Sequence, residues 1–171
     1  MSEFAGERIA KVIARAGICS RRDAERLITE GRVSVNGERL KSAAVNVTVH
    51  DSIMVNGKPL PQQDEKRLGM YHKPACRVVS NRDPEGRPTI FEKLRSQLPR
   101  VVSIGRLDIN TEGLLLLTND GELARFMELP STGWIRRYRV RAYGKADTAA
   151  LAKIANGVEI EGVKYRPVEA K

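Results

Sequence analysis

Cysteine and histidine are scarce in this chain of 171 residues, which contains two of each. Cys19 and Cys76 lie far apart without C-x-x-C spacing, and adding His50 and His72 gives no metal-ligand pattern. The sequence also lacks the glycine-rich loops G-x-x-x-x-G-K-[ST] and G-x-G-x-x-G that bind nucleotides. We therefore predict reduced thiols and no metal site, and nothing in the sequence suggests a nucleotide cofactor.

Long apolar runs are also missing. No stretch approaches the roughly 20 residues that a membrane-spanning helix needs, and the first residues, MSEFAGERIAK, lack the apolar core of a secretory signal. Acidic residues are outnumbered, 21 against 30 Lys and Arg, which gives a formal charge of +9. We expect a cytoplasmic protein, away from membranes, whose positive charge binds nucleic acid.

Two helices are predicted at the start of the chain. Apolar residues recur at helical spacing over 5–16, and Gly17 ends this helix. Ser20 then begins a capping box with Asp23, and Gly31 ends the second helix.

Hairpins and a linker follow the helices. Asn-Gly pairs at 36–37 and 56–57 stand between short β-type runs, which is a strong hairpin signal. Residues 58–67, KPLPQQDEKR, contain two prolines and mixed charge, as linkers do. We therefore place a boundary near residue 65. The predicted domains are 5–62 and 66–171.

The second predicted domain mixes strands with short helices. IFEKL and the capped segment 146–157 are expected to be helical, and Asn119-Asp120-Gly121 forms the turn and cap of another helix. The alternation in 138–144 predicts a half-exposed strand, and 83–88 predicts an ordered, basic loop. The fold class is therefore α+β, with a mixed or mainly antiparallel sheet in the second domain.

The basic residues of the first domain are clustered on its helices and their exit. They are Arg8, Lys11, Arg15, Arg21, Arg22, Arg26 and Arg32. Few acids interleave with them, so the cluster is expected to neutralise phosphates and to bind with strong salt dependence. The alternative is an ordinary solvated helix face.

The most informative acid stands in GRLDINTEG, residues 105–113. Asp108 lies two residues from Arg106 and shortly before the run Leu114–Leu117, which we predict to be a fully buried strand. Burial would disfavour the charged form of this aspartate, and the guanidinium would favour it. Such a carboxylate in a sheltered cleft serves as nucleophile or base, although a structural Asp–Arg pair is the alternative.

Three segments resemble known families. RIAKVIARAGICSRRDAERLITEGRVSVNG resembles the S4 RNA-binding domain, with the RNA-facing bases on the cluster named above. GRLDINTEGLLLLTNDGELA resembles the catalytic signature of pseudouridine synthases, and an S4 domain before it is typical of their RsuA/RluB branch. KPACRVVSNRDPEGRPTIFEKL resembles the companion motif, in the form found in enzymes that modify large-subunit ribosomal RNA.

The resemblance implies that a specific uridine of 23S ribosomal RNA is isomerised to pseudouridine, without cofactor or metal. The N-glycosidic bond breaks, the uracil turns in the pocket, and its carbon 5 joins the ribose. Asp108 would be essential, either attacking the sugar or removing a sugar proton. The target uridine must leave its stack, which costs a few kcal/mol.

The resemblance also assigns supporting residues. Arg106 would pair with Asp108 and fill the vacated base position. Tyr138 would stack on the flipped uracil and assist proton removal at carbon 5; its alternative is a cross-strand aromatic that packs the sheet. Thr111 would shape the Asp108 loop by local hydrogen bonding, in a structural or a catalytic role.

The family continues past the point that matches residue 171, through a basic motif near EGRNRQVRR, so we expect a C-terminally truncated chain. An RNA-binding protein with an inert second half is therefore a competing hypothesis, and a synthase for 16S RNA is another. The expected partner is ribosomal RNA, free or in an assembling large subunit, and the expected state is a monomer.

Overall fold

The computed structural model describes residues 6–170, so the predicted domain start at residue 5 lies outside the described residues. The chain divides into two compact units, Met1–Trp134 and Ile135–Lys171, which we describe separately. The domain boundary expected near residue 65 lies within the first unit and stays a prediction.

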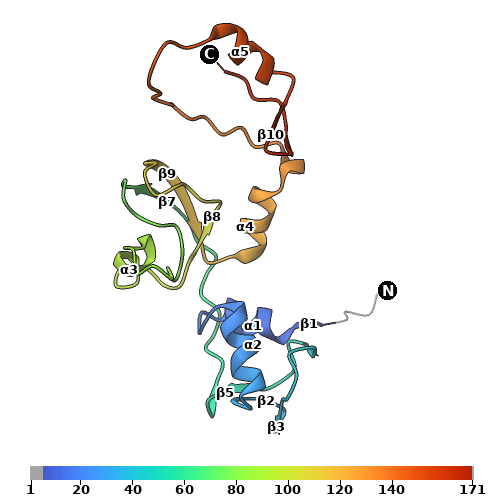
Figure 1. Ribbon diagram of the computed structural model, residues 1–171. Helices are drawn as coiled ribbons and strands as arrows, with labels where there is room; N and C mark the ends of the chain where they lie inside the picture. Colours follow the sequence, from blue (N-terminus) through green and yellow to red (C-terminus); the bar gives the residue numbers. More distant parts are fainter. Residues whose placement is uncertain (1–5, 171) are drawn as a thin grey trace. The chain divides into compact units, whose positions relative to one another are not determined.

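Two packed helices, α1 (Ile9–Arg15) and α2 (Arg21–Thr29), lie in the N-terminal part of the first unit (Figure 1). The Ser20 side chain caps α2 by accepting the Asp23 N–H at 3.0 Å, as the sequence predicts. The helices bury matching apolar stripes. The buried residues are Ile9, Ala10, Ile13, Ala24, Leu27 and Ile28.

A four-stranded antiparallel sheet, in the order β3-β2-β5-β6, completes this core. Its strands are β2 (Val33–Val35), β3 (Glu38–Arg39), β5 (Ile53–Val55) and β6 (Lys58–Pro59). Both Asn-Gly hairpins are confirmed, because Asn36, Gly37, Asn56 and Gly57 all have the positive φ that such turns require. A further short pair joins β1 (Glu7–Arg8) to β4 (Asn46–Val47).

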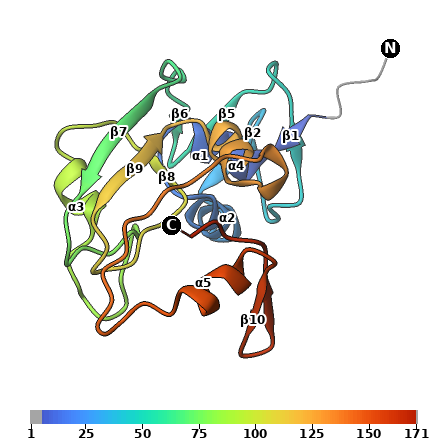
Figure 2. The same ribbon diagram turned by 90° about the horizontal axis from the view of Figure 1, so that it is seen from above.

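A second antiparallel sheet follows in the same unit, in the order β7-β9-β8. Its strands are β7 (Leu68–Lys73), β8 (Val102–Ile104) and β9 (Gly113–Thr118). Helix α3 (Ile90–Leu94) and helix α4 (Gly121–Glu128) lie on opposite sides of this sheet (Figure 2), and a short 3-10 turn, η1 (Pro130–Thr132), follows. The predicted α+β class and both helices are confirmed.

The four-leucine run is not the fully buried strand that the sequence suggested. Burial alternates along β9: Leu115 is 3% exposed, whereas Leu114 is 65% exposed. The inward leucines pack against α3 with Ile90 and Phe91. Successive strand residues point to opposite faces of the sheet. Leu114 therefore points away from α3 and stays exposed, because no helix covers it there.

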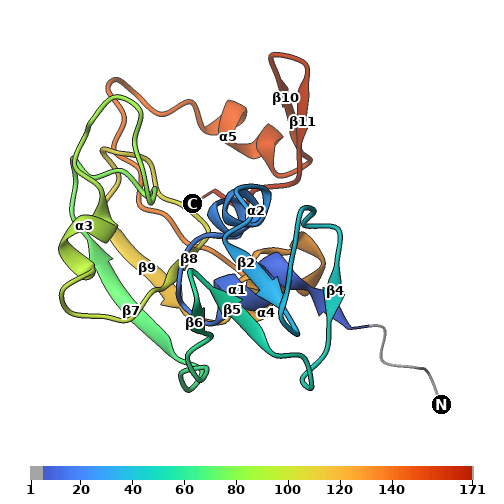
Figure 3. The ribbon, with the colours of Figure 1, turned by 90° about the horizontal axis from the view of Figure 1, so that it is seen from below.

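The second unit contains helix α5 (Thr148–Ile154), capped by Asp147, and a hairpin of β10 (Val158–Ile160) with β11 (Val163–Tyr165) (Figure 3). The helix expected over 146–157 is therefore confirmed. The strand expected over 138–144 is wrong, because this segment is irregular. Alternation alone does not make a strand; a neighbouring backbone must accept its hydrogen bonds, and no described strand pairs with this segment.

Candidate active site and nucleic-acid interface

Asp108 lies on the loop that connects β8 to β9. The Thr111 N–H donates to the Asp108 carbonyl oxygen at 3.0 Å and closes a tight turn. Upstream, the Gly105 N–H donates to Glu128 Oε1 of α4 at 2.7 Å. The loop is thus tied on both sides of Asp108, while the Asp108 residue itself is exposed.

The surroundings of Asp108 differ from the predicted sheltered Asp–Arg pair. Arg106 is also exposed, and among the described residues no ion pair joins it to Asp108. The reason is that β9 is buried on one face only, so the loop that leads into this strand lies at the surface. The Asp108 carboxylate accepts no hydrogen bond within residues 6–170 and therefore stays available to a substrate.

The cation beside this loop is Lys73, to which the sequence reasoning assigned no role. Lys73 is fully buried, and its ammonium donates to the carbonyl oxygens of Pro74 at 3.1 Å, Ile109 at 3.1 Å and Thr111 at 2.7 Å. Burial lowers the pKa of Lys73, against the opposing charges of Cys76 and Asp108.

A signal for Lys73 was present in the strand alternation. Lys73 and Tyr71 share the register that faces inward, opposite Gly113 and Leu115 of β9. An inward lysine at a strand end needs buried acceptors, so its position pointed to a polar site there.

Thr111 shapes the loop through its backbone: its N–H closes the turn and its carbonyl accepts from Lys73. Tyr138 belongs to the second unit, where it is 60% exposed in the irregular segment. Its assignment to the active site stays a prediction.

Most of the seven basic residues of the first domain are paired, contrary to the expectation that few acids lie among them. On α2, Arg21 pairs with Glu25 at 3.5 Å and Arg26 with Asp23 at 3.1 Å. Arg32 pairs with Glu30 at 3.1 Å after the helix. Spacings of four and three residues along α2 bring the charges of the first two pairs together.

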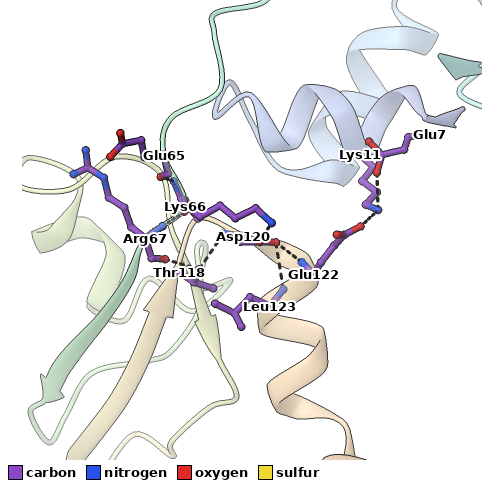
Figure 4. A network of polar contacts seen from close by, with 10 residues as sticks. Glu7, Lys11, Glu65, Lys66, Arg67, Thr118, Asp120, Glu122 and Leu123 are labelled. Carbon is purple, nitrogen blue, oxygen red and sulfur yellow. Dashed lines mark hydrogen bonds and ion pairs between the residues drawn. The ribbon is translucent and has the colours of Figure 1, made fainter. Parts of the chain in front are cut away.

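The bases of α1 are engaged as well. Lys11 contacts Glu7 at 2.9 Å and Glu122 of α4 at 2.6 Å (Figure 4), and Glu122, followed by Glu7, raises the pKa of Lys11. Arg15 also pairs with Glu7. Within the described residues, Arg8 and Arg22 are the members of the seven without an ion pair.

These surface pairs do not exclude an RNA-binding role. Exposed ion pairs are worth only about 0–1 kcal/mol, so a guanidinium can exchange a carboxylate for a phosphate. Ten arginines line one open groove of the first unit, and Arg21, Arg22, Arg26 and Arg106 are among them. The predicted basic loop is partly neutralised, because Arg87 pairs with Asp83 at 2.8 Å.

Within residues 6–170, no group of three or more His, Cys, Asp or Glu side chains is arranged to hold a metal ion. None of the helices in that range has the length and apolar character needed to cross a membrane.

Comparisons with known proteins match both halves of the chain. The model of the S4 domain matches residues 7–53, and the model of RNA pseudouridylate synthase matches residues 67–169. An RNA-binding domain joined to an enzyme that modifies RNA is the class that these matches define. The chain belongs to the RNA pseudouridylate synthase family, whose members are isomerases.

Individual relatives agree with this assignment. An RNA pseudouridine synthase of Rickettsia felis is 51% identical over 165 residues, covering 96% of this chain and 71% of the relative. Ribosomal large subunit pseudouridine synthase B of Pseudomonas aeruginosa is 45% identical, covering 91% of this chain but only 42% of its own length. The crystal structure of a pseudouridylate synthase aligns with a TM-score of 0.53 and 28% identity, covering 95% of this chain and 70% of that one.

Proposed function

We propose that this chain isomerises a specific uridine of 23S ribosomal RNA to pseudouridine, with Asp108 as its catalytic carboxylate and without cofactor or metal. The observation that carries the proposal is the Asp108 loop, whose backbone is tied on both sides while its carboxylate faces solvent. The large-subunit RNA is favoured by relatives named ribosomal large subunit pseudouridine synthase B, at 43–45% identity.

The reaction needs no second substrate. The bond between uracil nitrogen 1 and ribose carbon 1′ breaks, the uracil turns, and carbon 5 bonds to carbon 1′. Carbon 5 then loses its hydrogen as a proton, and nitrogen 1 gains a proton. Asp108 either attacks the sugar as nucleophile or removes a proton from it, and both routes need an ionised carboxylate.

Neighbouring residues serve the same step. Arg106 is exposed two residues before Asp108 and fills the space that the flipped base leaves in the RNA helix. Tyr138 stacks on the flipped uracil, and Thr111 keeps the turn closed beneath Asp108. Flipping costs a few kcal/mol, which phosphate contacts along the arginine-lined groove offset. The enzyme acts as a cytoplasmic monomer on ribosomal RNA, free or in an assembling large subunit.

Tritium release tests the proposal. RNA labelled with tritium on carbon 5 of uridine loses the label when carbon 5 gives up its hydrogen. We expect release from 23S RNA with the unmodified chain and none with Asp108→Asn. Glu112→Gln is the matched control, because Glu112 is an exposed carboxylate on the same loop, and it should release tritium at the normal rate.

Each alternative has its own outcome. Release from 16S RNA alone would favour a small-subunit enzyme. RNA binding without release at any protein concentration would favour an RNA-binding protein with an inert second half. Full release by Asp108→Asn would remove Asp108 from the chemistry.

A further inference from the structure

A buried lysine stands beneath the Asp108 loop. Lys73 is the last residue of β7 and faces inward, opposite Gly113, where β9 begins. It has no exposed surface, although its side chain carries a charge. A buried ammonium is costly unless its donors are used, so its contacts show what it stabilises.

All three ammonium donors of Lys73 are directed at backbone carbonyls. One acceptor is the adjacent Pro74, and the other two, Ile109 and Thr111, belong to the turn that follows Asp108. The Thr111 N–H closes the same turn onto the Asp108 carbonyl. The lysine therefore connects a strand of the sheet to the turn that carries the aspartate, through hydrogen bonds strengthened by its charge.

A neutral side chain could fill the same volume but could not donate to these carbonyls. Three carbonyl dipoles converge on one point, and without a cation they repel one another. The turn could then relax outward, since Asp108 and Asn110 lie at the surface and oppose no movement.

We propose that Lys73 is a positioning residue for the isomerisation: its ammonium fixes the 108–111 turn and thereby the carboxylate of Asp108. This inference rests on the proposed function, because it assumes that Asp108 acts on the uridine. It assigns to Lys73 no contact with the RNA.

The test separates chemistry from binding. Under single-turnover conditions, Lys73→Met should slow pseudouridine formation by about a hundredfold, because displacement by about 1 Å has that effect on a reacting group. The Kd for the same RNA should stay within about twofold. The control is Leu117→Ala, which removes a buried side chain from the same face of the sheet, away from the turn. It should lower Tm at least as much while leaving the single-turnover rate within about threefold.

Restoring the charge provides the decisive comparison. In a Cys19→Ser, Cys76→Ser background, Lys73→Cys is alkylated while unfolded and then refolded. Bromoethylamine gives a lysine analogue with sulfur in the chain, whereas bromopropane gives a neutral side chain of the same length. We expect the amine-bearing protein to recover most of the rate and the propyl protein to resemble Lys73→Met. Hydrogen exchange at the Thr111 amide should be faster in the propyl protein.

Three results would overturn the inference alone, and a fourth would overturn the proposed function as well. The propyl and amine proteins could form pseudouridine equally fast, or Lys73→Met could lose RNA affinity in proportion to its rate. The propyl protein could fail to fold while the amine protein is active, which would make Lys73 a folding residue only. In these cases an inactive Asp108→Asn would leave the proposed function standing. Full activity of Asp108→Asn would remove both proposals.

Discussion

The Asp108 loop and the basic face of α2 present charge in opposite ways. The loop holds its aspartate through contacts to the backbone, from the buried Lys73 and from Glu128 of α4. On α2, Arg21 and Arg26 are more than half exposed and pair with acids on the same helix.

The difference separates a fixed site from an exchangeable one. Contacts to backbone carbonyls define where a side chain stands, as a reacting group requires. Surface ion pairs contribute little to stability and are screened by salt. Such weak pairs suit a surface whose arginines must exchange carboxylates for the phosphates of RNA. Substitutions in the loop should therefore change rates, and substitutions on α2 should change affinity.

The largest of the remaining effects is expected on α2. Arg21→Ala combined with Arg22→Ala should weaken RNA binding at about 0.1 M salt by roughly tenfold to a hundredfold, because two phosphate contacts are lost. The slope of log Kd against log salt should fall by roughly 1–2. Binding titrations at several salt concentrations measure both. An unchanged slope would mean that these arginines do not contact phosphate. The basic face of α2 would then not be the exchangeable RNA-binding surface that we contrast with the Asp108 loop.

Glu128 tests whether the Asp108 loop is held in a fixed position. Glu128→Ala removes the acceptor of the Gly105 N–H, so turnover should fall about tenfold with unchanged RNA affinity. Glu122→Ala on the same helix is the control, because Glu122 contacts Lys11 rather than the loop. Equal rates for the two variants, measured in a single-turnover assay, would show that α4 does not position the loop.

Asp120 should matter for stability more than for rate. It caps the N-terminus of α4: its carboxylate accepts hydrogen bonds from the N–H groups of Glu122 and Leu123 and pairs with Lys66 at 2.7 Å (Figure 4). Asp120→Ala should lower the free energy of unfolding by about 1–2 kcal/mol at neutral pH. Glu25→Ala, which removes only an exposed partner of Arg21, should change it little. Denaturant titration compares the two, and equal losses would contradict the distinction.

The same residue sets a pH dependence. The hydrogen bond from Lys66, and then the backbone N–H groups, hold the pKa of Asp120 below its usual value of about 3.9. Its contribution is therefore complete above the unfolded-state pKa and is lost as pH falls through the lower folded-state value. Asp120→Ala should show a flatter loss of stability below about pH 5.

The first half of the chain was predictable because its signals are local. The Ser20 cap and the two Asn-Gly turns depend on residues only a few positions apart, and each forms as expected. The pairing of β1 with β4 was not predicted, since its partners lie far apart in sequence and each strand has only two residues.

The candidate site was predictable in identity but not in environment. Asp108 could be selected from its motif, whereas its exposure depends on which face of β9 the helices cover. The expected partner Arg106 is only two residues away in sequence, but the loop is contacted by Lys73, which lies 36 and 38 residues from its two acceptors there. Periodicity alone cannot show such a contact, because it is decided by strand pairing.

The most direct measurement is binding and pseudouridine formation by Asp108→Asn on one 23S RNA preparation. We expect a Kd within about twofold of the unmodified chain and no detectable pseudouridine, because the variant keeps the loop and loses only the ionisable oxygen. Pseudouridine formed at the normal rate by this variant would contradict the assignment of Asp108.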